Sequence, residues 1–208
     1  MISKRSLLCR SAAATVAVSA ALVLAACGNG NGNDASAGHN GHTAASPSAS
    51  APISQGQHNA ADVAFAKGMI PHHRQGIEMA GLAASRAQSA EVKKLAEDIR
   101  KAQDPEIKTL SGWLTSWGEQ VPAEGSHSAH GMAGMMSPQE MEKLKNSSGA
   151  AFDTAFMELM IKHHEGAVEM AKTEKAQGVF PDAKTMADAI VTAQSAEIEQ
   201  MNKLLGRS

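Results

Sequence analysis

The chain has 208 residues and a formal net charge of −2, and hydrophobic residues make up 43% of it. Aromatic residues are only 3%, tyrosine is absent and no basic patch with interleaved aromatics occurs, so nucleic acid is excluded as a partner. Methionine occurs 12 times, and this abundance indicates either irregular helical packing or soft metal ligation.

The first 26 residues have the pattern of a bacterial lipoprotein signal peptide. Three cations precede a small, apolar stretch that is too short and too rich in alanine for a transmembrane helix. The stretch ends in Leu-Ala-Ala directly before Cys27, which resembles a lipobox, so we expect Cys27 to be lipidated. A plain signal peptide followed by a chance cysteine is the alternative. The expected location is extracytoplasmic, on the outer face of the cytoplasmic membrane, with the lipid anchor as the contact to the membrane.

Removal of the signal peptide would change both the cysteine count and the charge. Cys9 would be lost and Cys27 acylated, so the folded part would hold no free thiol and no disulfide. Loss of the three cations would move the formal net charge from −2 to −5. Residues 27–57 consist mainly of Gly, Asn, Ser, Ala and Pro, and we expect a flexible tether there.

From Asn59 onward the apolar residues follow helical spacing. We expect one domain over residues 58–208, with long helices over about residues 60–88, 89–118, 149–176 and 181–205. A short helix is predicted to begin after Ser137 and to end near Lys145, because Ser137 and Glu140 form a capping box. Pro71 lies inside the first helix and is expected to bend it or to remove one backbone hydrogen bond.

The helical domain repeats itself with a shift of 91 residues and no gap. Met69-Ile-Pro-His72-His73, followed by Glu78-Met79-Ala80, returns as Met160-Ile-Lys-His163-His164, followed by Glu169-Met170-Ala171. Repeat 1 spans about residues 59–118 and repeat 2 about residues 149–206, and each is predicted to be one helical hairpin. A lone hairpin cannot cover its apolar stripe, so we expect an all-α four-helix bundle with a short extra helix in the middle connection.

The repeated motif puts imidazole and thioether groups on one broad face of a helix, because its spacings correspond to one and two helical turns. The small residue between them, Gly76 or Ala167, leaves room for an ion or a closely packed neighbour. Core methionines and hydrogen-bonded core histidines are the simpler interpretation of either copy alone. Four histidines in one small bundle favour a metal site. The predicted ligands are Met69, His72, His73, Met79, Met160, His163, His164 and Met170.

A second cluster of soft ligands lies in the connection between the repeats, at about residues 121–136. Its candidate ligands are His127, His130, Met132, Met135 and Met136. Thioether and imidazole together favour Cu(I) and Ag(I) over zinc or iron, so we expect a capture arm or lid for such an ion. A polar loop whose methionines pack onto the bundle is the alternative.

Other kinds of chemistry have little support. No glutamate lies three residues before any motif histidine, which argues against a di-iron centre. Glu78 and Glu169 are interpreted either as partners that hold an imidazole in one tautomer or, as we favour, as surface charges. No nucleophile elbow and no phosphate-binding glycine loop occurs. We therefore expect no catalytic residues and no organic cofactor.

The doubled M-I-x-H-H…E-M-A pattern resembles the bacterial "domain of unknown function 305" family over about residues 59–205. This resemblance implies a ferritin-like bundle, and the family includes periplasmic copper-binding proteins. It also implies copper binding through the histidines and methionines of the two motifs.

The resulting hypothesis is a membrane-tethered metal-binding lipoprotein that binds copper for storage, buffering or handover. Cu(I) is the favoured ion, with Ag(I) and Cu(II) as further candidates. A copper-trafficking protein and a second copy of the chain are the partners considered. The alternatives are a redox-active metalloenzyme of the bundle class and a helical interaction module that binds no metal.

Overall fold

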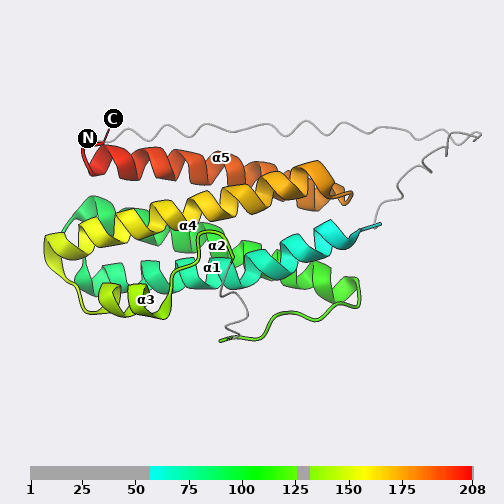
Figure 1. The fold of residues 1–208 in the computed structure, drawn as a ribbon, viewed down its shortest axis with the longest axis horizontal. Coiled ribbons are helices and arrows are strands. Elements are labelled where there is room, and N and C mark those ends of the chain that lie inside the picture. Colours follow the sequence, from blue (N-terminus) through cyan, green and yellow to red (C-terminus); the bar gives the residue numbers. More distant parts are fainter. Residues whose placement is uncertain (1–56, 126–131, 208) are drawn as a thin grey trace, which may run out of the picture. The chain divides into compact units, whose positions relative to one another are not determined.

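The computed structural model of the protein describes residues 57–125 and 132–207. The described part forms five helices, α1 (Ala60–Arg86), α2 (Ala90–Ser116), α3 (Pro138–Lys145), α4 (Gly149–Gln177) and α5 (Pro181–Leu204), and it contains no strand (Figure 1). The predicted all-α bundle of two hairpins with a short helix between them is confirmed. The predicted signal peptide, Cys27, residues 27–56 of the tether, His127 and His130 lie outside these ranges.

The two hairpins meet through their first helices. Helix α1 packs against α2 within its own hairpin and against α4 of the other, while α4 packs against α5 (Figure 1). The short helix α3 contacts both α1 and α4. The two helices that carry the repeated motif are therefore direct neighbours at the centre of the bundle.

Two aspartates in equivalent positions show that α1 and α4 run antiparallel. Asp62, at the start of α1, accepts hydrogen bonds from the backbone amides of Val179 and Phe180 at the turn between α4 and α5, at 3.1 and 3.0 Å. Asp153, at the start of α4, accepts hydrogen bonds from the amides after α1, those of Gln88 at 3.0 Å and Ser89 at 2.8 Å. The aspartate of each repeat thus caps the turn that follows the first helix of the other repeat. Because these contacts are reciprocal, an approximate twofold axis relates the two halves.

Local sequence signals explain the helix ends. Ser137 and Glu140 form the expected capping box of α3, with distances of 3.2 and 2.7 Å between the amide nitrogens and the accepting side-chain oxygens. Asn59 and Asp62 form a second capping box at the start of α1. Helix α1 continues through Pro71, which cannot donate a backbone hydrogen bond.

The core consists of two apolar clusters at opposite ends of the bundle. One is centred on Phe152 and Phe156 with Leu144, and the other contains Phe65 and Ile190. The motif histidines separate the two clusters along α1 and α4. No helix in the described ranges is both long enough and apolar enough to cross a lipid bilayer.

Candidate metal centre

His72 and His163 meet at the centre of the bundle. Each lies near the middle of its helix, α1 or α4, and each is fully buried. Their ring centroids are 3.8 Å apart, with 39° between the ring planes. None of the four ring nitrogens has a hydrogen-bond partner among the described residues. We call these two residues the inner histidine pair.

Burial keeps the inner histidine pair neutral. It lowers the pKa of His72 to about 3, with the adjacent His73 as a second cause, and the nearby Ala133 carbonyl opposes the effect without completing a hydrogen bond. Burial, followed by the neighbouring His72, also lowers the pKa of His163 well below its usual value. Each ring is therefore neutral near neutral pH, with one nitrogen that carries a proton and one nitrogen whose lone pair is free.

The second histidine of each motif points toward the other helix of its own hairpin. His73 Nε2 lies 2.7 Å from an Oε2 atom of Glu106 on α2, and His164 Nε2 lies 2.6 Å from Oε2 of Glu197 on α5. Both rings are fully buried, and the Nδ1 atom of each lacks a partner within the described structure. We call these two residues the outer histidines.

The four histidines are neighbours, but they do not form a ready-made metal site. Across residues 57–125 and 132–207, no group of three or more His, Cys, Asp or Glu side chains is arranged to hold a metal ion. The inner pair and the two outer histidines instead form a buried row across the bundle, because His73 and His164 turn toward different helices.

Glu106 and Glu197 were not predicted to take part in a site. Each follows its histidine by 33 residues, and the two are equivalent in the 91-residue repeat. Their equivalence in the repeat was the only sign of a role that the sequence offered. A pair of repeated surface charges would look the same, because only the packing of the helices shows which glutamate meets a histidine. Glu78 and Glu169 are exposed, in line with expectation, and Glu78 forms an ion pair with Lys145 at 2.7 Å.

The predicted methionine ligands fall into two groups. Met69, Met79 and Met160 are fully buried in the apolar clusters. The sulfur atoms of Met170 and Met132, in contrast, lie 3.5 and 3.6 Å from the point that a Cβ atom on Gly68 would occupy. Gly68 precedes His72 by one helical turn on α1, so these two thioethers lie beside α1 about one turn away from His72.

The segment 132–136 of the connection packs over α1 and α4. The amide of Met136 donates to Oε1 of Gln75 at 2.7 Å, and the Gln75 amide donates to the Met136 carbonyl at 3.0 Å. A Cβ atom on Gly166 would lie 2.1 Å from the Ala133 carbonyl oxygen, so only glycine allows this approach. Met136 is buried and Met135 is partly exposed, as the packing alternative for this loop expects.

The glycine within the first motif provides space beside the inner pair. A Cβ atom on Gly76 would lie 2.6 Å from Gln103 Oε1 and 3.1 Å from His163 Cε1. Gln103 is buried, and its side-chain oxygen and nitrogen both lack a partner among the described residues. The expected role of Gly76 in leaving room is therefore borne out by the packing.

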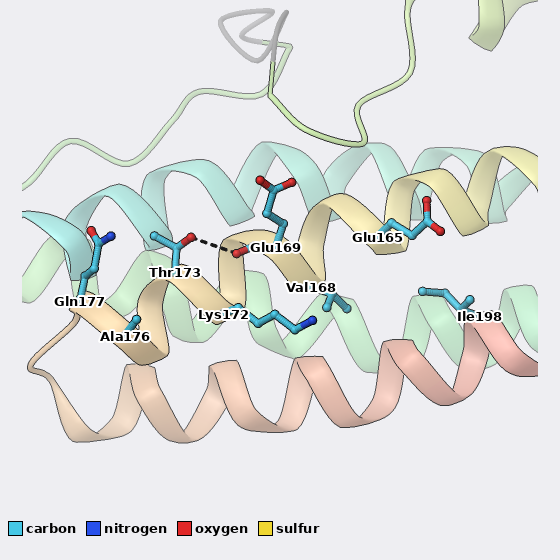
Figure 2. A pocket seen from close by; sticks show the side chains of 8 residues that line it. All are labelled: Glu165, Val168, Glu169, Lys172, Thr173, Ala176, Gln177 and Ile198. Atoms are coloured by element: carbon cyan, nitrogen blue, oxygen red, sulfur yellow. Dashed lines mark hydrogen bonds between the residues drawn. The ribbon is translucent and has the colours of Figure 1, made fainter.

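A surface hollow between α4 and α5 lies apart from this row. Figure 2 shows it lined on the α4 side by Glu165, Glu169 and Lys172, whose side chains are exposed, and on the α5 side by Ile198. None of the predicted ligands lines it. The candidate centre is thus the buried row of histidines and not this hollow.

Known protein structures resemble the chain over most of its length. A putative secreted protein from Streptomyces coelicolor is 34% identical with a TM-score of 0.64, covering 70% of this chain and 91% of its own. A fragment from Deinococcus radiodurans is 31% identical with a TM-score of 0.65, covering 72% and 98%. CopM in its Cu(I)-bound form is 35% identical with a TM-score of 0.59, covering 69% and 94%. CopM has also been solved in Cu(II)-bound and Ag-bound forms.

The family comparison agrees with these likenesses. The Streptomyces and Deinococcus proteins are both described as DUF305 proteins. No curated protein is significantly similar to the chain. The model of the family described as Domain of unknown function (DUF305) matches residues 62–205, which include all four motif histidines. The chain therefore belongs to the DUF305 family.

Proposed function

We propose that this protein binds copper at the inner histidine pair and holds the ion for storage, buffering or handover. The observation that carries the proposal is that His72 and His163 are fully buried, with ring centroids 3.8 Å apart and four unpartnered ring nitrogens. The copper ion is cargo in this proposal, and no substrate is transformed.

An ion would resolve the energetic cost of this arrangement. A buried polar group without a hydrogen bond costs about 1–3 kcal/mol, and the inner pair has four such nitrogens, of which the unprotonated one of each ring could bind an ion. Imidazole nitrogen is a common ligand of copper and zinc, and it binds metal only when unprotonated. Because burial lowers the pKa of both residues, protons compete weakly for the one free lone pair of each ring near neutral pH.

The sulfur atoms nearby favour Cu(I) among the ions that imidazole binds. Met132 and Met170 bring their thioethers to Gly68, one turn from His72. Thioether ligands select soft ions such as Cu(I) and Ag(I) over Zn(II). The relative CopM, about a third identical to this chain, has been solved with Cu(I), Cu(II) and Ag, which supports copper or silver as the cargo here.

The proposed place of action is the outer face of the cytoplasmic membrane. This part rests on the leader pattern and on Cys27, and a thiol-free ligand set suits an oxidising space because thioethers do not form disulfides. A copper-trafficking protein that receives or supplies the ion is the partner that this role requires.

Competition with a chromophoric Cu(I) chelator tests the proposal. The wild-type domain should withdraw at least one copper ion per chain from the chelator, and the double variant H72A/H163A should lose affinity by about 100-fold or more, since 100-fold corresponds to only about 2.7 kcal/mol. His58→Ala is the matched control, because His58 stacks on Trp117 at the end of the bundle and lies outside the histidine row.

Circular dichroism of each variant separates lost ligation from lost folding. A folded H72A/H163A variant with wild-type Cu(I) affinity would refute the inner pair as the copper site. In that case, the outer histidines and two thioethers, that of Met132 in the connection and that of Met170 on α4, become the remaining candidates, and replacement of Met132 and Met170 by Leu would test the thioethers.

A further inference from the structure

We propose that Glu106 and Glu197 are positioning residues that hold the outer histidines in one tautomer, so that each presents its Nδ1 atom as the metal-binding atom. This inference rests on the proposed function and deepens it, because it assigns a ligand atom to His73 and to His164.

The contact occurs twice with the same geometry. In each hairpin the carboxylate comes from the second helix, and the distances from Nε2 to Oε2 are 2.7 Å for Glu106 and 2.6 Å for Glu197. The two pairs are related by the 91-residue repeat. Their side-chain exposures are also alike, at 0% and 24% for His73 and Glu106 and at 0% and 20% for His164 and Glu197.

The chemistry of the pair determines the tautomer. A carboxylate oxygen accepts hydrogen bonds, so the Nε2 atom of the imidazole must carry a proton and donate it. Nδ1 is then the ring nitrogen whose lone pair can bind a metal ion. In both outer histidines this Nδ1 atom is buried and has no donor within the described residues, so a metal ion is the kind of group that would satisfy it.

The arrangement follows a general rule for metal-binding histidines. Such residues usually donate their second ring nitrogen to a carboxylate or carbonyl, which fixes the ring and raises its basicity, and loss of this partner costs about 10–100-fold in metal affinity. The inner histidine pair lacks such partners, because both nitrogens of His72 and His163 are unpaired. The outer histidines are thus preorganised, whereas the inner pair keeps a free choice of ligand atom.

A purely structural role makes different predictions. If Glu106 and Glu197 served only to fasten α1 to α2 and α4 to α5, then their replacement by glutamine would lower thermal stability and leave metal affinity unchanged. A positioning role requires a change in tautomer and in copper affinity while the fold persists.

The experiment uses ¹⁵N-labelled protein without metal, followed by Cu(I) competition with a chromophoric chelator. Two-bond ¹H–¹⁵N correlation spectra of the wild type should show His73 and His164 protonated at Nε2. In the double variant E106Q/E197Q, these histidines should become tautomer mixtures, because glutamine can either accept or donate. Copper affinity should fall by about 10–100-fold, with an unchanged circular dichroism spectrum.

The control is E78Q/E169Q, a second pair of repeated glutamates on the exposed surface, and it should leave both measurements unchanged. Copper binding by the wild type together with wild-type affinity in E106Q/E197Q would overturn the positioning role alone. Nδ1 protonation of His73 and His164 in the wild type would also overturn it. Absence of copper binding by the wild type would overturn the proposed function itself, so the two failures are distinguishable.

Discussion

Glu174 makes the stability of the bundle depend on pH in a direction that one substitution can test. This residue on α4 is 1% exposed and lies against Asp62, and a Cβ atom on Gly178 would meet oxygen atoms of both carboxyl groups. Burial raises the pKa of Glu174 to about 8, and Asp62 adds to this by hydrogen bonding and charge, while Lys184 opposes it. At neutral pH, Glu174 is therefore mainly protonated and donates to Asp62.

The partner carboxylate has the opposite behaviour. Burial by itself raises the pKa of Asp62, but hydrogen bonds from Glu174 and from the amides of Asn59, Phe180 and Val179 outweigh it and lower the pKa. Asp62 therefore stays ionised and keeps its cap on the turn between α4 and α5. The interaction between protonated Glu174 and ionised Asp62 therefore links α4 to α1.

The expected magnitude follows from linkage. Between pH 4.5, the usual value for glutamate, and pH 8, the folded protein holds a proton that the unfolded chain releases, so the free energy of unfolding falls as pH rises. A rise to about 8 corresponds to at most about 5 kcal/mol, at about 1.4 kcal/mol per pKa unit. Because Glu174 lines a surface hollow with Phe65 and Met170, water screens part of this electrostatic effect, and we expect about 2–4 kcal/mol.

Glu174→Gln replaces the titrating carboxyl group by an amide of nearly the same shape. Urea unfolding at pH 5, 7 and 9.5, followed by tryptophan fluorescence, should show nearly equal stability at pH 5 and a variant that is more stable than wild type by about 2–4 kcal/mol at pH 9.5. The exposed Glu169→Gln on the same helix is the control and should follow the wild-type curve. A constant difference between E174Q and wild type across this range, or a less stable E174Q at high pH, would refute the reasoning.

Three glycine substitutions test the packing around the histidine row. Gly76→Ala should destabilise the fold by about 1–3 kcal/mol in urea, because its methyl group would lie 2.6 Å from Gln103 Oε1. Gly81→Ala on the same helix meets no atom within 4 Å and should stabilise it by about 0.5–1 kcal/mol, so equal effects would contradict the structure. Gly166→Ala should displace segment 132–136, since the added carbon would lie 2.1 Å from the Ala133 carbonyl oxygen, and faster amide hydrogen exchange at Met136 would report it. Unchanged exchange there would mean that the segment is held elsewhere.

The fold was predictable because the same pattern occurs twice. Helical spacing set the number and type of the elements, and the capping box at Ser137 located the start of α3 to the residue. The expected helix ends differ from the observed ends by at most about two residues. Tertiary contacts decide where a helix ends: α1 ends at Arg86 because Asp153 caps the turn that follows it. Local pattern thus accounts for the elements, and the repeat accounts for their pairing.

The site was predictable only in part. Spacing on a single helix placed His72 and His73 on one broad face, but adjacent residues on a helix point about 100° apart, and the surrounding helices decide what each one meets. His72 meets its repeat counterpart at the twofold axis, whereas His73 meets Glu106 on α2. The same applies to the methionines, because only tertiary packing decides which thioethers fill the core and which remain near Gly68.

Departures from the repeat identify the side of the bundle on which an ion and its sulfur ligands would meet. Met79 is fully buried in an apolar cluster, while its counterpart Met170 is partly exposed and shares the space at Gly68 with Met132. The counterpart of Gly68 in the second repeat is Leu159, which fills that space on the other side. The four histidines follow the twofold symmetry of the repeat, because His73 and His164 make equivalent contacts to Glu106 and Glu197. The thioethers beside them do not follow this symmetry. A soft ion bound by both kinds of ligand would accordingly occupy one side of the twofold axis, and symmetry alone does not imply two equivalent copper ions per chain.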